Sequence, residues 1–337
     1  MSKKIISTIF LILLTSIVFY FLIKDNYQNI FESIMHANFL FLLLALFLYV
    51  IYTLLQAVPF YLFSKTHKYK IKFFFFVYLI IATNFFNGIT PLATGGQPLQ
   101  IYELHKKGIS TVDATNIVIE NFIIFQLSAV LFGLLSIIIN SIFHLFTVNS
   151  ILNNLTIIGF ILNTILLFFI IIVAFGKQFI QNLIFFFLNI LDKLKIIKNI
   201  EAKKENWKKT CLKFNNNFKL LLKNKNVLIK SLFILILAFF IYYSIPITIM
   251  YSLNIHENIT IFTTVIISSY VFLASSYLPV PGATGGVEYS FIGYFSNYIK
   301  GYKLNSLLLI WRFITYYLPM IIGGIVFNIK SAKKIRK

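Results

Sequence analysis

Residues 84–98 read NFFNGITPLATGGQP, and residues 275–288 read SSYLPVPGATGGVE. Both stretches place Ala-Thr-Gly-Gly behind a proline in the middle of a long apolar segment. Proline cannot donate a hydrogen bond to a helical ladder, and paired glycines tolerate a strained turn. The sequence therefore predicts a helix that breaks and restarts in each of two segments, at 73–105 and 260–299.

The composition around these two segments is typical of a membrane protein. Of the 337 residues, 59% are hydrophobic and only 12% are charged. Six further segments are apolar and long enough to cross a hydrocarbon core of about 30 Å; they lie at 5–23, 39–63, 112–139, 151–175, 231–253 and 304–328. We therefore predict an all-α polytopic integral membrane protein with about six full spans, the first of them a retained span and not a cleaved signal.

The basic residues indicate how the chain is oriented. The formal net charge is +20, but Lys and Arg gather between the apolar segments and form no stripe with interleaved aromatic residues, which argues against a nucleic-acid partner. Such clusters mark the cytoplasmic side of a membrane protein. The clusters lie at 3–4, 65–72, 106–107, 192–230 and 330–337, so we expect both termini in the cytoplasm.

With this orientation, each broken segment must enter and leave the membrane on the same side. Counting either one as a simple crossing would place a later basic cluster outside. We expect two re-entrant hairpins, the first from the cytoplasm and the second from outside, in the inverted-repeat arrangement common among secondary transporters. The alternative is a pair of ordinary Gly/Pro kinks in tightly packed helices.

The domain prediction follows from these segments. We expect one transmembrane domain over 1–337, with a first half at about 1–175 and a second half at about 231–337. A basic cytoplasmic linker at about 176–230 joins the halves, either as a solvated loop or as an amphipathic helix on the membrane surface.

The two breaks are also the candidate binding site. Broken backbone at membrane depth must be buried in protein or line a water-filled cavity. Helix N-termini carry partial positive charge and unpaired donors, so two half-helices that begin at the Gly-Gly pairs would bind an anion of phosphate size without a metal ion. The candidate lipid-phosphate-binding residues are Gly95, Gly96, Gln97, Gly285, Gly286 and Arg312.

Charged residues within the apolar segments need partners. Arg312 lies deep in 304–328, where an unpaired charge is costly, so we expect it to contact an acidic side chain or a lipid phosphate. The acidic candidates are Glu288, at the start of the second return half-helix, and Glu120, which shares a helical face with Asp113 and Asn116. A structural ion pair and a functional one both stay open.

The sequence shows no catalytic or metal-binding pattern. It has no zinc-binding pair of histidines, nucleotide-binding Gly-rich loop or nucleophile elbow. Its five histidines are scattered, and Cys211 is its single cysteine. We therefore expect no catalytic residues, no metal and no cofactor in this chain.

Residues around both breaks and in the last span form a recognisable set: Gly95, Gly96, Gln97, Pro98, Tyr102, Leu104, Gly108, Glu120, Pro281, Gly282, Gly285, Gly286, Glu288, Arg312, Tyr316, Pro319 and Gly323. This set resembles the flippase-like transmembrane region of lysylphosphatidylglycerol synthases, over nearly the whole chain. The resemblance implies flippase-like or scramblase-like movement of an anionic or aminoacylated phospholipid, such as phosphatidylglycerol or lysyl-phosphatidylglycerol, in a bacterial cell membrane. It also implies resistance to cationic antimicrobial peptides.

The chain departs from this family in two ways. Complete synthases carry a C-terminal aminoacyltransferase domain, whereas this chain ends at Lys337, so phosphatidylglycerol lysyltransferase activity would require a separate synthase subunit. Some members place a basic residue after the acidic residue matched by Glu120, but here Asn121 follows. An accessory membrane protein that moves no lipid is a third hypothesis, and a homodimer stays open.

Overall fold

The structure is a computed structural model of the chain, and it describes residues 26–147, 149–176 and 224–335, with isolated positions at 20, 24 and between 182 and 208. The predicted first span at 5–23 and most of the predicted linker at 176–230 lie outside the described residues. Within the described part, all regular secondary structure is helical. A short helix, α2 (Tyr27–Met35), precedes the first long one and packs against α13.

Five long apolar helices or helix pairs match five of the six predicted spans. They are α3 (Phe39–Thr66), α6 (Thr111–Phe143), α7 (Ser150–Phe175), α10 (Lys225–Ser252), and α13 (Tyr302–Arg312) continued by α14 (Leu318–Ile335). The side chains of Asn38, Ser110 and Asn149 cap the first three by accepting backbone N–H bonds. The multi-pass membrane prediction is confirmed for these helices, and α10 begins earlier than the predicted 231.

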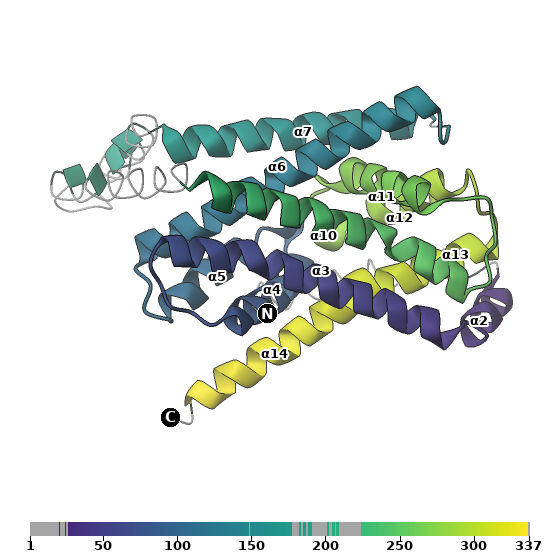
Figure 1. The fold of residues 1–337 in the computed structure, drawn as a ribbon, viewed down its shortest axis with the longest axis horizontal. Coiled ribbons are helices and arrows are strands. Elements are labelled where there is room, and N and C mark those ends of the chain that lie inside the picture. Colours follow the sequence, from purple (N-terminus) through teal and green to yellow (C-terminus); the bar gives the residue numbers. More distant parts are fainter. Residues whose placement is uncertain are drawn as a thin grey trace.

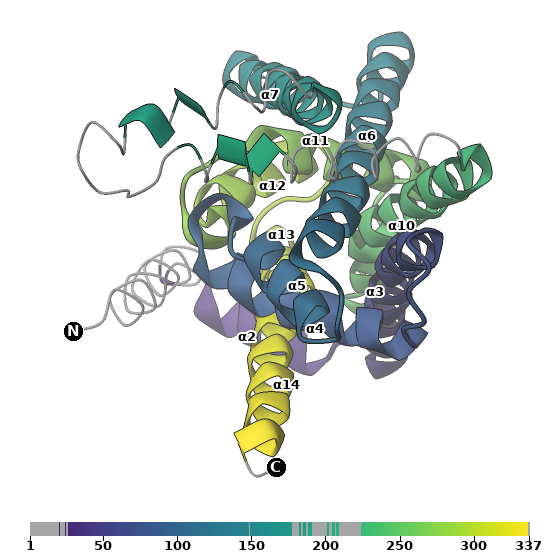
Figure 2. The ribbon, with the colours of Figure 1, turned by 90° about the vertical axis from the view of Figure 1, so that its left-hand side faces the viewer.

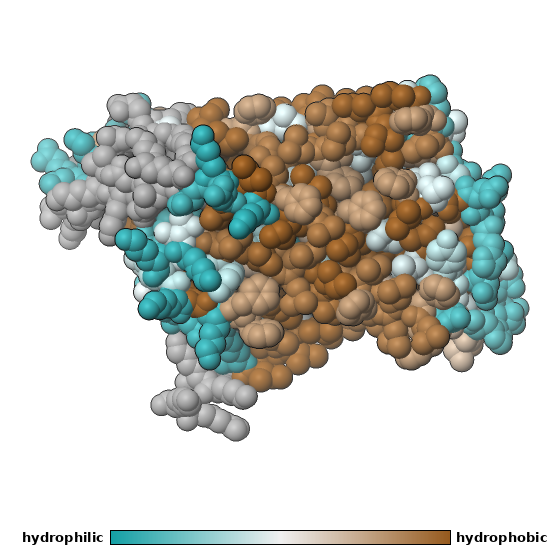
Figure 3. All heavy atoms as spheres, in the orientation of Figure 1, coloured by the Kyte–Doolittle hydropathy of each residue, from teal (hydrophilic) through white to brown (hydrophobic). Residues whose placement is uncertain are grey.

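The surface agrees with this assignment. Figure 3 shows a broad apolar band across the molecule, with hydrophilic residues gathered at its two ends. Soluble monomers rarely expose apolar patches of this extent, because the exposed apolar area costs free energy in water. The band therefore marks the surface that faces lipid.

The last long helix contains a feature that periodicity did not predict. A π-helical turn, η3 (Phe313–Tyr317), separates α13 from α14 directly after Arg312. Such single π turns are rare and occur frequently at functional sites. Here the turn places Thr315 and Tyr316 beside Arg312, as described below.

Both predicted helix breaks are present. The first lies between α4 (Phe73–Ile89) and α5 (Gly96–His105), at the 3₁₀ turn η1 (Pro91–Ala93). The second lies between α11 (Ile261–Ser275) and α12 (Gly286–Phe295), at the 3₁₀ turn η2 (Pro281–Ala283).

The two turns share a backbone conformation. After the proline, φ is +53° and +51° at Leu92 and Ala93 of η1, and +62° and +50° at Gly282 and Ala283 of η2. This left-handed region costs a non-glycine residue roughly 1–2 kcal/mol. The shared Pro-x-Ala-Thr-Gly-Gly sequence thus specifies the same local backbone conformation in both breaks.

The two broken pairs approach the centre of the molecule from different directions. α4 packs on α5, α11 packs on α12, and the turns η1 and η2 contact each other. Figure 1 shows α4 and α5 toward one end and α11 and α12 toward the other. α3 and α10 lie side by side next to them (Figure 1, Figure 2).

Two glycines bring helices unusually close to the broken pairs. A Cβ on Gly323 of α14 would lie 2.3 Å from the carbonyl oxygen of Ile81 in α4. A Cβ on Gly159 of α7 would lie 1.9 Å from the carbonyl oxygen of Leu273 in α11. Each broken pair is therefore held against a neighbouring helix at a distance that only glycine permits, as small residues do in membrane helix packing.

Three of the predicted basic clusters meet at one end, which we call the basic end. Near the start of α4, the ring of Phe75 lies 5.3 Å from Lys107 Nζ and 4.7 Å from Lys330 Nζ. Glu103 of α5 accepts bonds from Lys106 Nζ at 3.3 Å and Lys330 Nζ at 3.2 Å. The segment at 65–72, which ends where α4 begins, therefore shares a side with Lys106, Lys107 and Lys330.

Candidate functional site

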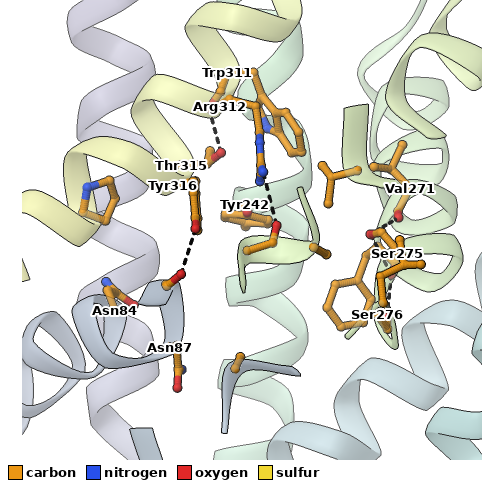
Figure 4. Close-up of a pocket in the computed structure, with 18 of the residues that line it drawn as sticks. Asn84, Asn87, Tyr242, Val271, Ser275, Ser276, Trp311, Arg312, Thr315 and Tyr316 are labelled. Atoms are coloured by element: carbon orange, nitrogen blue, oxygen red, sulfur yellow. Dashed lines mark hydrogen bonds between the residues drawn. The ribbon is translucent and has the colours of Figure 1, made fainter. Parts of the chain in front are cut away.

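A cavity of about 310 Å³ lies where the two breaks meet, and we call it the first cavity (Figure 4). Seven parts of the fold contribute to it: α3, α4 with the turn η1, α10, the second broken pair, α13, η3 and α14. Its lining includes Tyr49, Asn84, Asn87, Leu92, Tyr242, Ser268, Ser275, Gly282, Trp311, Arg312, Thr315 and Tyr316. Residues far apart in the sequence thus form one polar pocket.

Arg312 is the charged residue of this cavity. It is 4% exposed, and its Nε donates to Glu288 Oε1 at 2.7 Å. Its Nη2 donates to the carbonyl oxygen of Gly282 at 3.2 Å, and its guanidinium carbon lies 4.4 Å from the centre of the Tyr316 ring. The expectation that Arg312 contacts an acidic side chain is confirmed, and of the two candidates the partner is Glu288.

Glu288 holds two groups in place at once. Besides Arg312, its carboxylate accepts the backbone N–H of Gly285 at 2.6 Å, which caps the start of α12. Among the described residues that line the first cavity, Arg312 is the only charged one, so Glu288 orients the guanidinium from behind the cavity wall. The wall itself presents a positive group.

Two further donors in this wall are unused. Trp311 and Ser268 line the first cavity, and their Nε1 and Oγ atoms are buried without a hydrogen-bond partner among the described residues. Buried polar atoms in native proteins nearly always have a partner, so such atoms point to a bound molecule or ordered water. An N–H, a hydroxyl and a guanidinium together favour an anion or another acceptor.

The Gly-Gly pairs have a more local function in the structure. The N–H of Gly95 donates to Thr90 Oγ1 at 2.9 Å, and that of Gly96 to Asn87 Oδ1 at 2.8 Å. The N–H of Gly285 is occupied by Glu288, and none of these glycines or Gly286 lines the first cavity. Of the six candidate phosphate-binding residues, Arg312 lines the first cavity, Gln97 lines the second, described next, and the four glycines shape the breaks.

A second cavity of about 270 Å³ adjoins the first, and the two share Tyr49, Asn84, Asn87, Tyr242 and Thr315. Six carboxamide side chains line it: Gln56, Asn84, Asn87, Gln97, Gln100 and Asn121. Its described lining contains no charged residue. Polar lining residues therefore extend from Arg312 along the first broken pair.

An apolar groove of about 420 Å³ meets both cavities from the side. It lies between α3, α4 and α14, and it is lined by Leu46, Tyr49, Val50, Thr53, Leu54, Val77, Ile81, Asn84, Leu318, Pro319 and Ile322. Tyr49 and Asn84 line all three spaces, and Pro319 lines the groove and the first cavity. A charged pocket and an apolar groove thus share a wall.

Glu120 lies apart from Arg312. It is fully buried in α6, and its Oε1 is 3.0 Å from His67 Nε2, just beyond the end of α3. Asn116 on the same face is also fully buried, so the polar face of α6 points into the bundle as expected. Glu120 Oε2 and the side chain of Asn116 have no partner among the described residues.

Several lining residues carried a signal that the sequence interpretation missed. Asn84 and Asn87 lie one helical turn apart in an apolar helix, and Tyr49, Tyr52 and Tyr242 place hydroxyl groups within long spans. Amides and phenols buried in lipid-spanning helices require partners. That requirement indicated an internal polar space, although it did not indicate which helices would share it.

Comparisons with known proteins give two findings. Residues 5–323 match the model of the family described as the lysylphosphatidylglycerol synthase TM region. The chain is also 25% identical over 306 residues, 89% of each chain, to a protein of Archaeoglobus fulgidus described as a UPF0104 membrane protein. The family match includes both breaks, Arg312 and the residues shared by the two cavities and the groove.

Proposed function

The chain belongs to the family of the lysylphosphatidylglycerol synthase TM region, and from that premise we propose that it translocates a membrane phospholipid with an anionic headgroup. The observation that carries the proposal is that the first cavity and the apolar groove adjoin each other and share Tyr49, Asn84 and Pro319. A small anion would need only the cavity. A phospholipid needs both, because its phosphate and its acyl chains require different surroundings only a few atoms apart.

The chemistry of the cavity wall supports a phosphate as the charged group. Moving an isolated anion from water into a medium of low dielectric constant costs on the order of 20 kcal/mol in the idealised Born treatment. Arg312 offers a fixed opposite charge, and Trp311 Nε1 and Ser268 Oγ offer two unused donors. Since Glu288 holds the guanidinium by Nε, the positive charge is in place before a ligand enters.

The architecture supports alternating access of this site. In the proposal, α4–α5 and α11–α12 are re-entrant hairpins, and the halves at about 1–175 and 231–337 form an inverted repeat. Each half contains a long helix with a proline in its last third, Pro59 or Pro246, followed by a broken pair with the same turn. Rocking one half against the other would open the cavity first to one side and then to the other.

The orientation is part of the same proposal. The protein lies in the cell membrane, and its basic end faces the cytoplasm. The sequence clusters at this end are 65–72, 106–107 and 330–337. The lipid enters sideways along the apolar groove, and its headgroup enters the first cavity. The phosphate then stays beside Arg312 while the surrounding helices close the cavity to one side of the membrane and open it to the other.

Translocation in proteoliposomes tests the proposal. A fluorescent phosphatidylglycerol analogue is placed in both leaflets, and the rate at which inner-leaflet label becomes accessible to an external quencher is measured. We expect the purified chain to exceed protein-free vesicles, and the variant Arg312→Met/Glu288→Leu to reduce the rate at least about tenfold, the equivalent of about 1.4 kcal/mol. The double variant removes both charges, so that neither is left buried alone.

The matched control is Gln126→Leu/Asn163→Leu. These side chains form a buried hydrogen-bonded pair between α6 and α7, with Gln126 Nε2 donating to Asn163 Oδ1 at 2.6 Å, and they line neither cavity nor the groove. The control should translocate like the wild type. A wild-type translocation rate equal to that of protein-free vesicles would contradict the proposal. So would an equal reduction of the rate in Arg312→Met/Glu288→Leu and in the control.

A further inference from the structure

We propose that the second cavity selects the lipid headgroup, and that it binds an uncharged, hydroxyl-rich group such as glycerol or a sugar attached to the phosphate. This inference rests on the proposed function, because it assumes that the phosphate lies beside Arg312. It adds the class of substrate. It also excludes a headgroup that carries an ammonium group.

The chemistry of the lining suits hydroxyl groups. A carboxamide offers an acceptor oxygen and two N–H donors, and a hydroxyl group both donates and accepts, so the two groups can satisfy each other fully. Six carboxamides surround this cavity, together with the hydroxyl groups of Tyr49, Tyr52, Thr83, Tyr242 and Thr315. Few other headgroups would use so many neutral donors and acceptors.

The amides are partly held and partly available. Asn84 Nδ2 donates to the Tyr49 hydroxyl at 3.2 Å, and Gln100 Nε2 donates to Thr83 Oγ1 at 3.1 Å. These bonds fix the side chains while leaving other polar atoms for a ligand. Asn121 Oδ1 is buried without a hydrogen-bond partner among the described residues, which is the same indication that Trp311 and Ser268 give in the first cavity.

An ammonium group would be poorly stabilised in this place. Among the described lining residues the second cavity has no carboxylate, and Glu288 is occupied by Arg312 and Gly285 N–H. The second cavity shares Asn84, Asn87 and Tyr242 with the first, and the charged residue that lines the first is the cation Arg312. Like charges in a low-dielectric interior repel strongly.

The position of the second cavity matches the order of groups in a phospholipid. The groove shares Tyr49, Asn84 and Pro319 with the first cavity, and the first cavity shares Asn84 and Asn87 with the second. Acyl chains, phosphate and terminal headgroup can therefore lie in the groove, the first cavity and the second cavity in turn. Gln97 and Asn121 would contact the terminal group.

Binding of short-chain lipids tests the inference without relying on transport. The purified chain in detergent is titrated with dihexanoyl forms of phosphatidylglycerol, phosphatidylinositol, phosphatidylethanolamine and phosphatidic acid, and the thermal unfolding midpoint is recorded. We expect the glycerol or the inositol lipid to bind at least about tenfold more tightly than the ethanolamine lipid. Comparison of the first two separates a glycerol from a sugar-like headgroup.

Two variants locate the selectivity. Gln97→Leu and Asn121→Leu should weaken binding of the preferred hydroxyl-rich lipid at least about tenfold. They should leave the binding of phosphatidic acid unchanged, because its headgroup is the phosphate alone. Asn328→Leu is the control, because that amide donates only to the carbonyl oxygen of Gly324 within α14 and lines neither cavity.

The possible results separate this inference from the proposed function. The inference is overturned, and translocation is left intact, by either of two results. One is that the ethanolamine lipid binds as tightly as the glycerol and inositol lipids. The other is that Gln97→Leu and Asn121→Leu weaken binding of phosphatidic acid as much as binding of the hydroxyl-rich lipid. Selective binding without translocation in proteoliposomes supports the headgroup site and contradicts the proposed function. No binding of any of the four lipids to folded protein overturns both.

Discussion

At the scale of single residues, Arg312 and Glu288 depend on each other. Removing one partner of a buried ion pair costs about 3–5 kcal/mol because the other charge is left uncompensated, whereas replacing both by apolar groups is often nearly neutral. We predict that Arg312→Met and Glu288→Leu each lower the free energy of unfolding by that amount. The double variant should recover most of the loss, except about 1 kcal/mol for the missing cap on α12.

Unfolding of the three variants in detergent, followed by circular dichroism, measures this coupling. Losses that simply add in the double variant would show that the two residues contribute independently. That result would contradict the buried pair.

Gly282 is the residue on which the second break depends most directly. Its φ is +62°, and a Cβ there would lie 2.2 Å from the ring of Tyr316, whose hydroxyl donates to the carbonyl oxygen of Gly88 at 2.9 Å. We predict that Gly282→Ala displaces Tyr316 and lowers the free energy of unfolding by more than the backbone penalty of roughly 1–2 kcal/mol, which unfolding in detergent measures. Gly108→Ala is the control, since Gly108 also has a positive φ, +87°, but has open space around it. Equal losses in the two variants would show that the Tyr316 contact is unimportant.

At the scale of helices, Leu273 of α11 provides a matched pair of tests. A Cβ on Gly159 of α7 would lie 1.9 Å from its carbonyl oxygen, whereas one on Gly133 of α6 would lie 3.2 Å from its flexible side chain. We predict that Gly159→Ala separates α7 from α11 and destabilises the protein by several kcal/mol, while Gly133→Ala is tolerated within about 1 kcal/mol. Thermal unfolding in detergent distinguishes them. Similar midpoints for both variants would contradict the close packing of α7 on α11.

The end of α3 is joined to α6 by a titratable contact. Burial lowers the pKa of His67. The hydrogen bond and the charge of Glu120, with a smaller effect of Asp113, together raise this pKa by more than burial lowers it, so it lies above its ordinary value of 6.5. A raised pKa in the folded state contributes stability that is complete below 6.5 and is lost as the pH rises through the folded value.

We therefore predict that the midpoint of thermal unfolding falls as the pH is raised from about 6 through neutrality, and that His67→Gln abolishes this slope. His256→Gln removes an exposed histidine before α11 and serves as the control, with an unchanged slope. A slope that persists in His67→Gln would assign the effect to another group.

Much of the fold at this scale followed from the sequence, and the reasons are physical. Apolar runs of span length specify helices, and Pro91 and Pro281 before Gly-Gly pairs specify breaks, because these signals are local. The choice of Glu288 over Glu120 as partner of Arg312 depends on how helices pack, which no local pattern gives. The π turn after Arg312 and the shared wall at Tyr49 and Asn84 were missed for the same reason.

At the scale of the whole molecule, the proposed function depends on three spaces being used together. The first cavity supplies a positive charge, the second supplies neutral polar groups, and the groove between α3, α4 and α14 supplies an apolar surface. Tyr49 and Asn84 belong to all three. One amphiphile that occupies the three spaces at once is the central claim, and its tail has to lie in the groove whenever its phosphate lies beside Arg312.

Photo-crosslinking of a phosphatidylglycerol analogue with a diazirine in its acyl chain tests this claim most directly. After irradiation in proteoliposomes, labelled peptides are identified by mass spectrometry, with and without excess unlabelled lipid. We predict labelling around Val50, Ile81 and Ile322 that the unlabelled lipid competes away and that Arg312→Met/Glu288→Leu abolishes. Labelling confined to apolar surface outside the groove, such as Phe168 of α7, and unchanged by competitor or by the double variant, would contradict the account.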